Sequence, residues 1–423
     1  MNFFTKSLFF AIPTFLILII IEAIVAKRKG KIINQPADLI SSLSSGITNI
    51  TKDGLKYSIV IVSYPWLLDK LIIYKLEPVW IAIFIAFIIQ DFTGYWIHRL
   101  NHRVNIFWNR HVIHHSSEEF NLSSGLRQSI SETFHFSAIL MIPAALLGIS
   151  HTIFIVLAPI HLFMQFWYHT RLINKMGWLE KIIVTPSHHR VHHAINPEYI
   201  DKNYGQIFII WDKLFGSFQA EKSDTTPVYG ILRPAKTWNP ILINYKHLWQ
   251  LIQDAYHTTK TWDKIRIWFM PTGWRPKDVI KKFPVRTINN PYKQSKYTTA
   301  NSPLIIFWSG IQLAISGSLV LLVFSNVDTL GQNITTLVCL FVMINIFSYT
   351  ALLDGSHITA LFADGFKLAV MGSMLLLLKG KAIPLSIIIV FLYGILQYTT
   401  NSIDMLHYRL PLRVKRVPVF SQD

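Results

Sequence analysis

Long apolar runs alternate with polar, histidine-rich blocks along the chain, and this pattern predicts an all-α membrane protein. Residues 8–26 form one apolar run long enough to cross a bilayer, and the runs at 57–74 and 78–97 predict a hairpin of two further spans. The apolar stretch at 134–167 is too long for one span, so it predicts a helical hairpin. Residues 34–56 are mixed and rich in serine, which predicts a loop or an interfacial helix.

The two hairpins bring the chain back to the side of the membrane on which the first span ends. The polar blocks at 98–132 and 168–301, which hold most of the histidines, therefore emerge on one membrane face. That shared face is the topological condition for the two blocks to build one site.

The last third of the chain has a different character, because its apolar runs carry no dense histidine motif. These runs predict a C-terminal multi-span appendage and lie at 304–324, 334–350, 366–378 and 383–398. We therefore expect a polytopic helical bundle with a histidine-rich domain facing the cytosol. Its predicted parts are an N-terminal membrane anchor region (1–76), a histidine-rich catalytic domain (77–280), a linker (281–302) and a C-terminal transmembrane region (303–423).

Composition supports a multi-pass membrane protein and narrows its partners. Hydrophobic residues make up 51% of the chain and charged residues 15%, against about 25% charged in soluble domains. The net charge is +17, and basic residues such as Lys27, Arg28 and Lys29 cluster at the ends of apolar runs. This placement fits the positive-inside rule and not a nucleic-acid partner. The first run lacks a small-residue cleavage pattern and is interpreted as a retained anchor.

The single cysteine, Cys339, excludes an intramolecular disulfide and any multi-thiolate metal site. A metal site in this chain must therefore use histidines and carboxylates. The 17 histidines supply four notable groups, which are His98/His102, His111/His114/His115, the single His169, and His188/His189/His192/His193.

The spacing of these histidines favours metal binding, because residues three or four apart lie on one face of a helix. Imidazole suits iron, zinc and copper, and facing helical arrays favour a dinuclear centre. A structural zinc cluster stays an alternative, although it would use about four ligands and often cysteine. A non-redox membrane metal-binding or transport protein is a further alternative, in which Asp91 or Asp354 marks an ion path. Histidines that stand alone are interpreted as ordinary polar residues, namely His135, His151, His247 and His257.

The order HxxxH, HxxHH and a distant HxxHH resembles the fatty acid hydroxylase/sterol desaturase superfamily. Narrower strings resemble its branch that cleaves O-alkylglycerol ethers, and these are HHSSEEFNLS (114–123), SHHRVHH (187–193), IDKNYG (200–205) and IWDKLFGSF (210–218). The resemblance implies two Fe ions, O₂, a lipid substrate and reduced tetrahydrobiopterin. It also implies hydroxylation of the alkyl carbon next to the ether oxygen, after which the hemiacetal collapses to a fatty aldehyde.

One departure leaves the substrate and the reductant open. Members of that branch carry an acidic residue directly after the second histidine of the first motif, where this chain has Arg103. A hydroxylase or desaturase that acts on a sterol, a fatty acyl chain or a carotenoid therefore stays an alternative. The chain contains no recognisable haem or cytochrome b5 module, so electrons come from a separate donor that the sequence does not identify.

The motifs and the positions that follow them predict roles for individual residues. Nine histidines are the predicted iron ligands, namely His98, His102, His111, His114, His115, His169, His189, His192 and His193. His188 is a ligand, a hydrogen-bonding neighbour of a ligand, or neither. Glu118, Asp201 and Asn203 are the predicted catalytic residues, since such groups can orient a ligand histidine through its second ring nitrogen.

Each of these three residues has an alternative as part of a solvated surface. Arg127 is expected to pair with one of the carboxylates. Trp211 and Asp212 are predicted to be structural, and Phe107 and Trp108 to be core residues or interface anchors.

Overall fold

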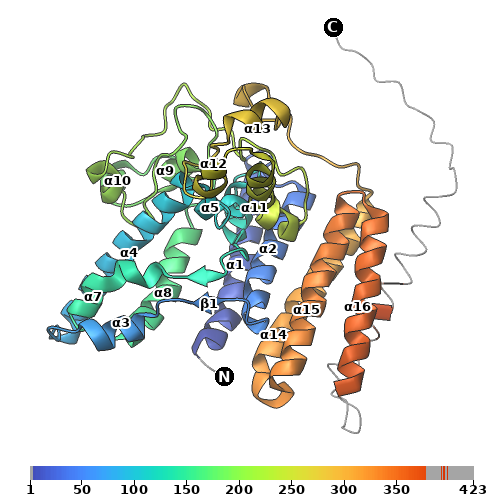
Figure 1. Ribbon diagram of the computed structural model, residues 1–423, viewed down its shortest axis with the longest axis horizontal. Coiled ribbons are helices and arrows are strands. Elements are labelled where there is room, and N and C mark those ends of the chain that lie inside the picture. Colours follow the sequence, from blue (N-terminus) through green and yellow to red (C-terminus); the bar gives the residue numbers. More distant parts are fainter. Residues whose placement is uncertain (1–2, 378–391, 393, 396–397, 399–423) are drawn as a thin grey trace.

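A computed structural model describes residues 3–377, 392, 394–395 and 398 of the chain. Within these residues the secondary structure is helical with almost no strand, as predicted, and five helices are long and apolar enough to cross a membrane. They are α1 (Phe3–Arg28), α4 (Val79–Arg103), α14 (Pro303–Ser325), α15 (Val327–Leu353) and α16 (His357–Leu377). The last three pack side by side and are drawn in orange in Figure 1. The chain is thus a multi-pass membrane protein, as expected.

The predicted span at 57–74 is wrong. This run forms the short strand β1 (Ile59–Val60) and the eight-residue helix α3 (Tyr64–Leu71). The Ser63 side chain accepts a hydrogen bond from the backbone N–H of Trp66 and so starts a new helix inside the run. Asp69 and Lys70 keep 70% and 58% of their side-chain surface exposed, which a hydrocarbon-buried span would not tolerate.

The stretch at 134–167 does form a helical hairpin. Its first arm consists of β2 (Phe134–His135), η2 (Ser137–Met141) and α7 (Ile142–Leu146), and its second arm is α8 (His151–Phe166). Strand β2 pairs in parallel with β1, with Ile59 opposite Phe134. Both arms are shorter than a full membrane span. Both pack against α4, the helix that carries the first histidine motif.

Residues 34–56 form neither a loop nor an interfacial helix. They form α2 (Pro36–Gly54), which is buried against α14 and α15 in the largest hydrophobic core. Small side chains permit the close approach, and the Ser44 hydroxyl lies 2.7 Å from the Tyr349 hydroxyl. The prediction failed because the surface that buries α2 comes from residues almost 300 positions later.

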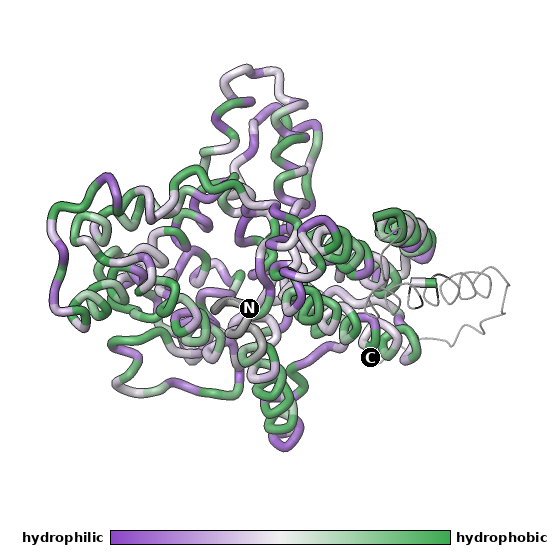
Figure 2. The backbone as a smooth tube through the Cα atoms, turned by 90° about the horizontal axis from the view of Figure 1, so that it is seen from below, coloured by the Kyte–Doolittle hydropathy of each residue, from purple (hydrophilic) through white to green (hydrophobic). Residues whose placement is uncertain are grey.

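Helices α14, α15 and α16 confirm three of the four C-terminal apolar runs. The fourth, at 383–398, lies for the most part outside the described residues. In Figure 2 the hydrophobic colour is heaviest on the long helices, consistent with their contact with lipid.

Short elements gather at one end of α4 and carry the polar blocks (Figure 1). They are α5 (Asn105–Trp108), α6 (Val112–His115), η1 (Leu122–Leu126), η3 (Gly177–Lys181), α9 (Pro186–His192), α10 (Ile210–Leu214), α11 (Pro240–His257), α12 (Thr261–Arg266), α13 (Lys277–Lys282) and η4 (Pro291–Lys293). All the histidine groups therefore lie on one side of the spanning helices, as the topology predicted.

Candidate metal centre

The nine predicted ligands converge at this end of α4. They form one group of five and one of four, in each of which the candidate ligand atoms lie within 4.8 Å of one another. The groups are His98, His102, His111, His115 and His192, and His114, His169, His189 and His193. The two groups adjoin, since the rings of His115 and His193 stack at 4.2 Å.

Local structure explains how each segment presents its histidines. His98 and His102 are one turn apart near the end of α4, and His189 and His192 lie on α9 with His193 as its C-cap. Thr185 caps α9, and Pro186 occupies its first turn, which favours a helix start at this point. His169 follows α8 and lies against Gly125, where a Cβ atom would stand 3.0 Å from the His169 Nδ1 atom.

Backbone carbonyls orient four of the imidazoles. The Nδ1 atoms of His98 and His192 lie 2.8 and 2.9 Å from the carbonyl oxygens of Tyr204 and Lys202. Those of His114 and His169 lie 3.2 and 3.3 Å from the carbonyls of Arg127 and Phe166. A carbonyl accepts only from N–H, so each Nδ1 carries the proton and each Nε2 offers a lone pair.

The facing Nε2 atoms are as close as ligands that share an ion. The Nε2–Nε2 distance is 2.9 Å for His98 and His111, 3.1 Å for His102 and His115, and 2.8 Å for His169 and His189. Metal–imidazole bonds of about 2.0–2.1 Å place two such nitrogens roughly 3 Å apart. The buried Nε2 of His192 has no hydrogen-bond partner, so the donor set fits metal ions.

Burial keeps these imidazoles neutral. Loss of solvation, and then the proximity of the other imidazoles, holds the pKa of His111, His115 and His193 well below the usual range. Burial also lowers the pKa of His169 to about 4. A neutral imidazole is the form that binds a metal.

A carboxylate lies beside His102, and it belongs to Asp201. One Asp201 oxygen is 3.9 Å from the His102 Nδ1 atom, and the other accepts a hydrogen bond from Arg103 at 2.9 Å. The Asn203 side-chain amide donates to the carbonyls of His188 and Gln219, and neither of these residues belongs to the two histidine groups. It therefore ties the loop after α9 to the helix.

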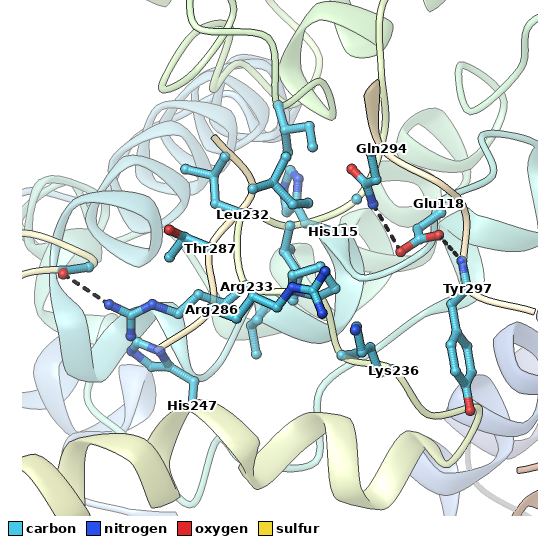
Figure 3. A pocket seen from close by; sticks show the side chains of 18 of the residues that line it. His115, Glu118, Leu232, Arg233, Lys236, His247, Arg286, Thr287, Gln294 and Tyr297 are labelled. Carbon is cyan, nitrogen blue, oxygen red and sulfur yellow. Dashed lines mark hydrogen bonds between the residues drawn. The ribbon is translucent and has the colours of Figure 1, made fainter. Parts of the chain in front are cut away.

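Glu118 lies in the wall of the cavity described below. It accepts hydrogen bonds from the Tyr297 backbone N–H at 2.5 Å and from the Gln294 amide at 3.2 Å (Figure 3). Burial raises the pKa of Glu118. Its neighbour Glu119 pairs with Arg171 and Lys296.

Arg127 pairs with none of these carboxylates, so that prediction is wrong. Its guanidinium donates to Asp38 of α2 at 2.7 Å, where both side chains are buried. His188 lies outside both histidine groups, and its Nδ1 is 3.4 Å from the backbone nitrogen of Thr185, at the start of α9.

Trp211 and Asp212 hold the loop that orients the centre. Asp212 accepts from the backbone N–H groups of Tyr204 and Gly205, both at 2.7 Å, so it positions the carbonyl that orients His98. The Trp211 indole donates to Asp91 at 2.8 Å.

Neither intramembrane carboxylate is arranged as an ion path. Asp91 also accepts from two backbone N–H groups after Gly205, and Asp354 binds the Trp238 backbone N–H and the Tyr297 hydroxyl.

A cavity of about 1070 Å³ opens against the histidines. Its inner end is formed by His102, His115, His192 and His193 together with Trp108, whose ring centroid lies 5.0 Å from that of His102. Hydrophobic side chains line part of the wall, namely Val112, Ile195, Ile200, Ile231 and Ile243. Because a long apolar chain needs such a wall, the cavity suits a lipid.

The remaining wall is strongly basic, which sequence analysis missed. Its cationic side chains are Arg233, Lys236, Lys246, Arg286, Lys293 and Lys296, against the carboxylates of Glu118 and Asp201. Figure 3 shows Arg233, Lys236 and Arg286 of this wall, with Glu118 hydrogen-bonded to Gln294 and Tyr297 of the linker segment. No local motif signals this wall, since its residues come from three separate segments.

Comparisons with known proteins agree with this architecture. The fatty acid hydroxylase family profile matches residues 83–217, which include all nine histidines of the two groups. No solved structure matches the chain. The fold and the paired histidine groups thus define a membrane enzyme of the di-iron fatty acid hydroxylase class.

Curated relatives narrow the class. Alkylglycerol monooxygenase of Homo sapiens is 34% identical over 347 residues, which is 81% of this chain and 77% of that protein. The enzymes of that name from Danio rerio and Xenopus tropicalis are 39% and 37% identical, over 63% and 62% of this chain and 59% and 58% of theirs. The chain belongs to the alkylglycerol monooxygenase family, whose members are iron-dependent oxidoreductases.

Proposed function

We propose that this protein is a lipid monooxygenase that cleaves the ether bond of O-alkylglycerols. The observation that carries the proposal is the cavity of about 1070 Å³, which ends on ligand histidines of both groups and has an apolar wall. The names of the relatives supply the substrate class.

The reaction balances with O₂ and two reducing equivalents. One oxygen atom enters the C–H bond of the alkyl carbon next to the ether oxygen, and the other leaves as water. The resulting hemiacetal then collapses to a fatty aldehyde and a glycerol. When bound, two Fe ions held by the nine histidines would supply O₂ activation.

The side chains of the cavity have separate tasks in this proposal. The apolar wall holds the alkyl chain, and the histidine end fixes the position of the oxidised carbon. Polar and cationic groups of the basic wall, including Lys236 and Arg286, hold the oxygen-rich glycerol end. Orientation thus selects the carbon next to the ether oxygen.

The three predicted catalytic residues act as positioning residues in this scheme. Asp201 orients His102, and Asn203 fixes the backbone of α9. Glu118 holds the linker segment around Tyr297, which forms part of the cavity wall.

We further propose that the site faces the cytosol and that reduced tetrahydrobiopterin is the electron donor. The basic cluster at Lys27, Arg28 and Lys29 follows the first span on the same side as the centre, which supports a cytosolic face. The pterin is supported by the resemblance of the histidine-flanking strings. Residues 77–280 are proposed as the catalytic domain.

The direct test uses the full chain in iron-replete membranes. A 1-O-alkylglycerol, O₂ and reduced tetrahydrobiopterin should yield a long-chain aldehyde, and omission of any one should abolish it. The His114→Ala variant is the negative control. No aldehyde from a preparation that contains iron contradicts the proposal.

A second incubation addresses the superfamily alternatives. A sterol or fatty acyl substrate should give no hydroxylated or desaturated product under the same conditions. If such a product forms and the ether lipid does not react, the proposed substrate class is wrong. The proposed metal centre would not be contradicted by that result.

A further inference from the structure

Helix α11 separates the catalytic cavity from the outside of the molecule. Its inner face lines the cavity through Ile243, Lys246, His247 and Gln250. Its outer face is apolar and exposed at Leu242, Trp249, Ile252 and Tyr256. These outer residues are seven, three and four positions apart, so they form one stripe along the helix.

The stripe continues onto the next elements. Trp262, Ile265 and Phe269 in and after α12 are exposed at helical spacing, and Phe269 leaves 70% of its surface uncovered. On the other side, the Tyr245 hydroxyl donates to the Tyr57 hydroxyl at 2.9 Å, next to the exposed apolar residues of β1. A contiguous apolar surface of this kind marks an interaction site.

Helix α11 starts at the depth of the spanning helices. The Asn239 side chain, which caps α11, donates to the carbonyl of Phe347 at 3.2 Å. Phe347 precedes the end of α15 by six residues, which at about 1.5 Å per residue is roughly 9 Å inside that end. Interfacial helices bury their apolar face by about 5–10 Å.

The unit is firmly tied from within. Arg275 donates to both carboxylate oxygens of Asp254, at 2.6 and 2.7 Å, and so fastens the segment before α13 to α11. Asp278 accepts from the backbone N–H of Thr259 at 2.9 Å and joins α13 to the start of α12. The apolar face is therefore a fixed surface and not the product of a loose segment.

Exposed lysines lie just before α12, on α12 and on α13, in the same part of the chain as this face. They are Lys260, Lys264, Lys277, Lys281 and Lys282, and none has an acidic partner among the described residues. Basic side chains beside an exposed Trp and Phe stripe suit a bilayer surface with anionic headgroups.

We propose that α11–α12 is an interfacial element that lies in the headgroup and upper acyl region of an anionic leaflet. Its outer face binds lipid while its inner face lines the cavity, so the wall of the site is held at the bilayer surface. This placement rests on the exposed stripe, its depth beside α15 and the lysines, and it does not depend on the substrate proposed above.

The test places an environment-sensitive fluorophore on cysteines introduced in the full chain. The probe sites are Trp249→Cys and Phe269→Cys, and the matched controls are the exposed positions Lys222→Cys and Asp224→Cys. The native Cys339 is buried, and the unsubstituted protein measures its background. Each protein is reconstituted in bilayers with phosphatidylserine and spin-labelled phosphatidylcholine, and iron content verifies the fold.

Emission from both probe sites should be blue-shifted and quenched by spin-labelled lipid at least about threefold more than from the controls. Quenching equal to the controls overturns the proposal. A blue shift that disappears on dilution of the protein, without lipid quenching, assigns the face to a second copy and also overturns it. Replacement of the five lysines by glutamine should remove any difference between anionic and neutral bilayers, and a retained difference contradicts the role given to them.

Discussion

The metal centre and the C-terminal bundle both bury polar side chains, but they arrange them differently. In the centre, histidines from four short segments present nitrogens to shared points, and backbone carbonyls orient four of them. In the bundle, several polar groups satisfy one another within a helix and between helices. Lys367 pairs with Asp364 at 2.5 Å and donates to Asn345 at 3.0 Å, and Asn345 donates to Ser316 at 2.9 Å.

This difference shows that buried polar side chains can have two roles: they can bind a ligand, or they can hold helices together. The histidine nitrogens converge on shared points, and one added ion could bind several of them at once. The ion pair of the bundle lies within α16, and the hydrogen bond from Lys367 to Asn345 links α16 to α15 without any ligand. We therefore expect substitutions in the metal centre to lower the iron content, and substitutions in the bundle to lower the stability without loss of iron.

The largest effect is expected for His114→Ala. His114 belongs to the group of four histidines, and its removal leaves too few nitrogens for that ion. Turnover should fall by more than about 100-fold, beyond the 10–100-fold typical of changes around ligands, and about one of two irons should be lost per chain. Metal analysis and aldehyde formation measure both effects. His151→Ala, at an exposed position, is the matched control, and equal iron in both variants would refute the ligand assignment.

Lys367→Met should destabilise the protein without loss of iron. It leaves the buried Asp364 carboxylate without its cation, at a cost of about 3–5 kcal/mol. The double variant Lys367→Met/Asp364→Leu should recover most of that loss, because apolar pairs often replace buried ion pairs at little cost. Thermal unfolding in detergent measures stability. Iron loss in the single variant, at a temperature where it stays folded, would show that the two regions are coupled.

A smaller effect is expected for Asp201→Asn, which keeps the shape but removes the charge beside His102. Loss of a group that orients a metal ligand typically lowers metal affinity by 10–100-fold. Because Asp201 is one-third exposed, we expect its substitution to lower iron affinity by about 10-fold. Chelator competition measures the affinity. Asp201→Glu should restore part of it, which a purely structural role would not predict. Arg103→Gln, at the exposed end of the pair, should change affinity by less than about threefold.

The grouping of the nine histidines could be predicted because much of its geometry is local. His98 and His102, or His189 and His193, lie one helical turn apart, so residue spacing alone places their rings together. The same holds for the long spans, whose length and hydropathy are properties of one segment. Family resemblance then joined the four groups into one centre.

Features that depend on distant residues could not be predicted. Helix α2 has few strongly apolar residues, and its burial comes from α14 and α15. Arg127 pairs with Asp38, which lies 89 positions earlier in the chain and carries no motif. The run at 57–74 looked like a span because hydropathy does not register the cap at Ser63. The basic cavity wall was missed since its residues share no pattern.

The smallest effect concerns a defect within the bundle. The Gln312 side chain is fully buried on α14, and neither its amide nitrogen nor its oxygen has a partner among the described residues. A buried unpaired amide costs about 1–3 kcal/mol, so Gln312→Met, which keeps the volume, should raise stability by roughly 1 kcal/mol. The same detergent unfolding assay measures it, with Ser318→Ala at an exposed position of α14 as control. A loss of stability would mean that Gln312 is hydrogen-bonded in the folded protein, and its amide would then follow the rule of the bundle, where polar groups satisfy one another.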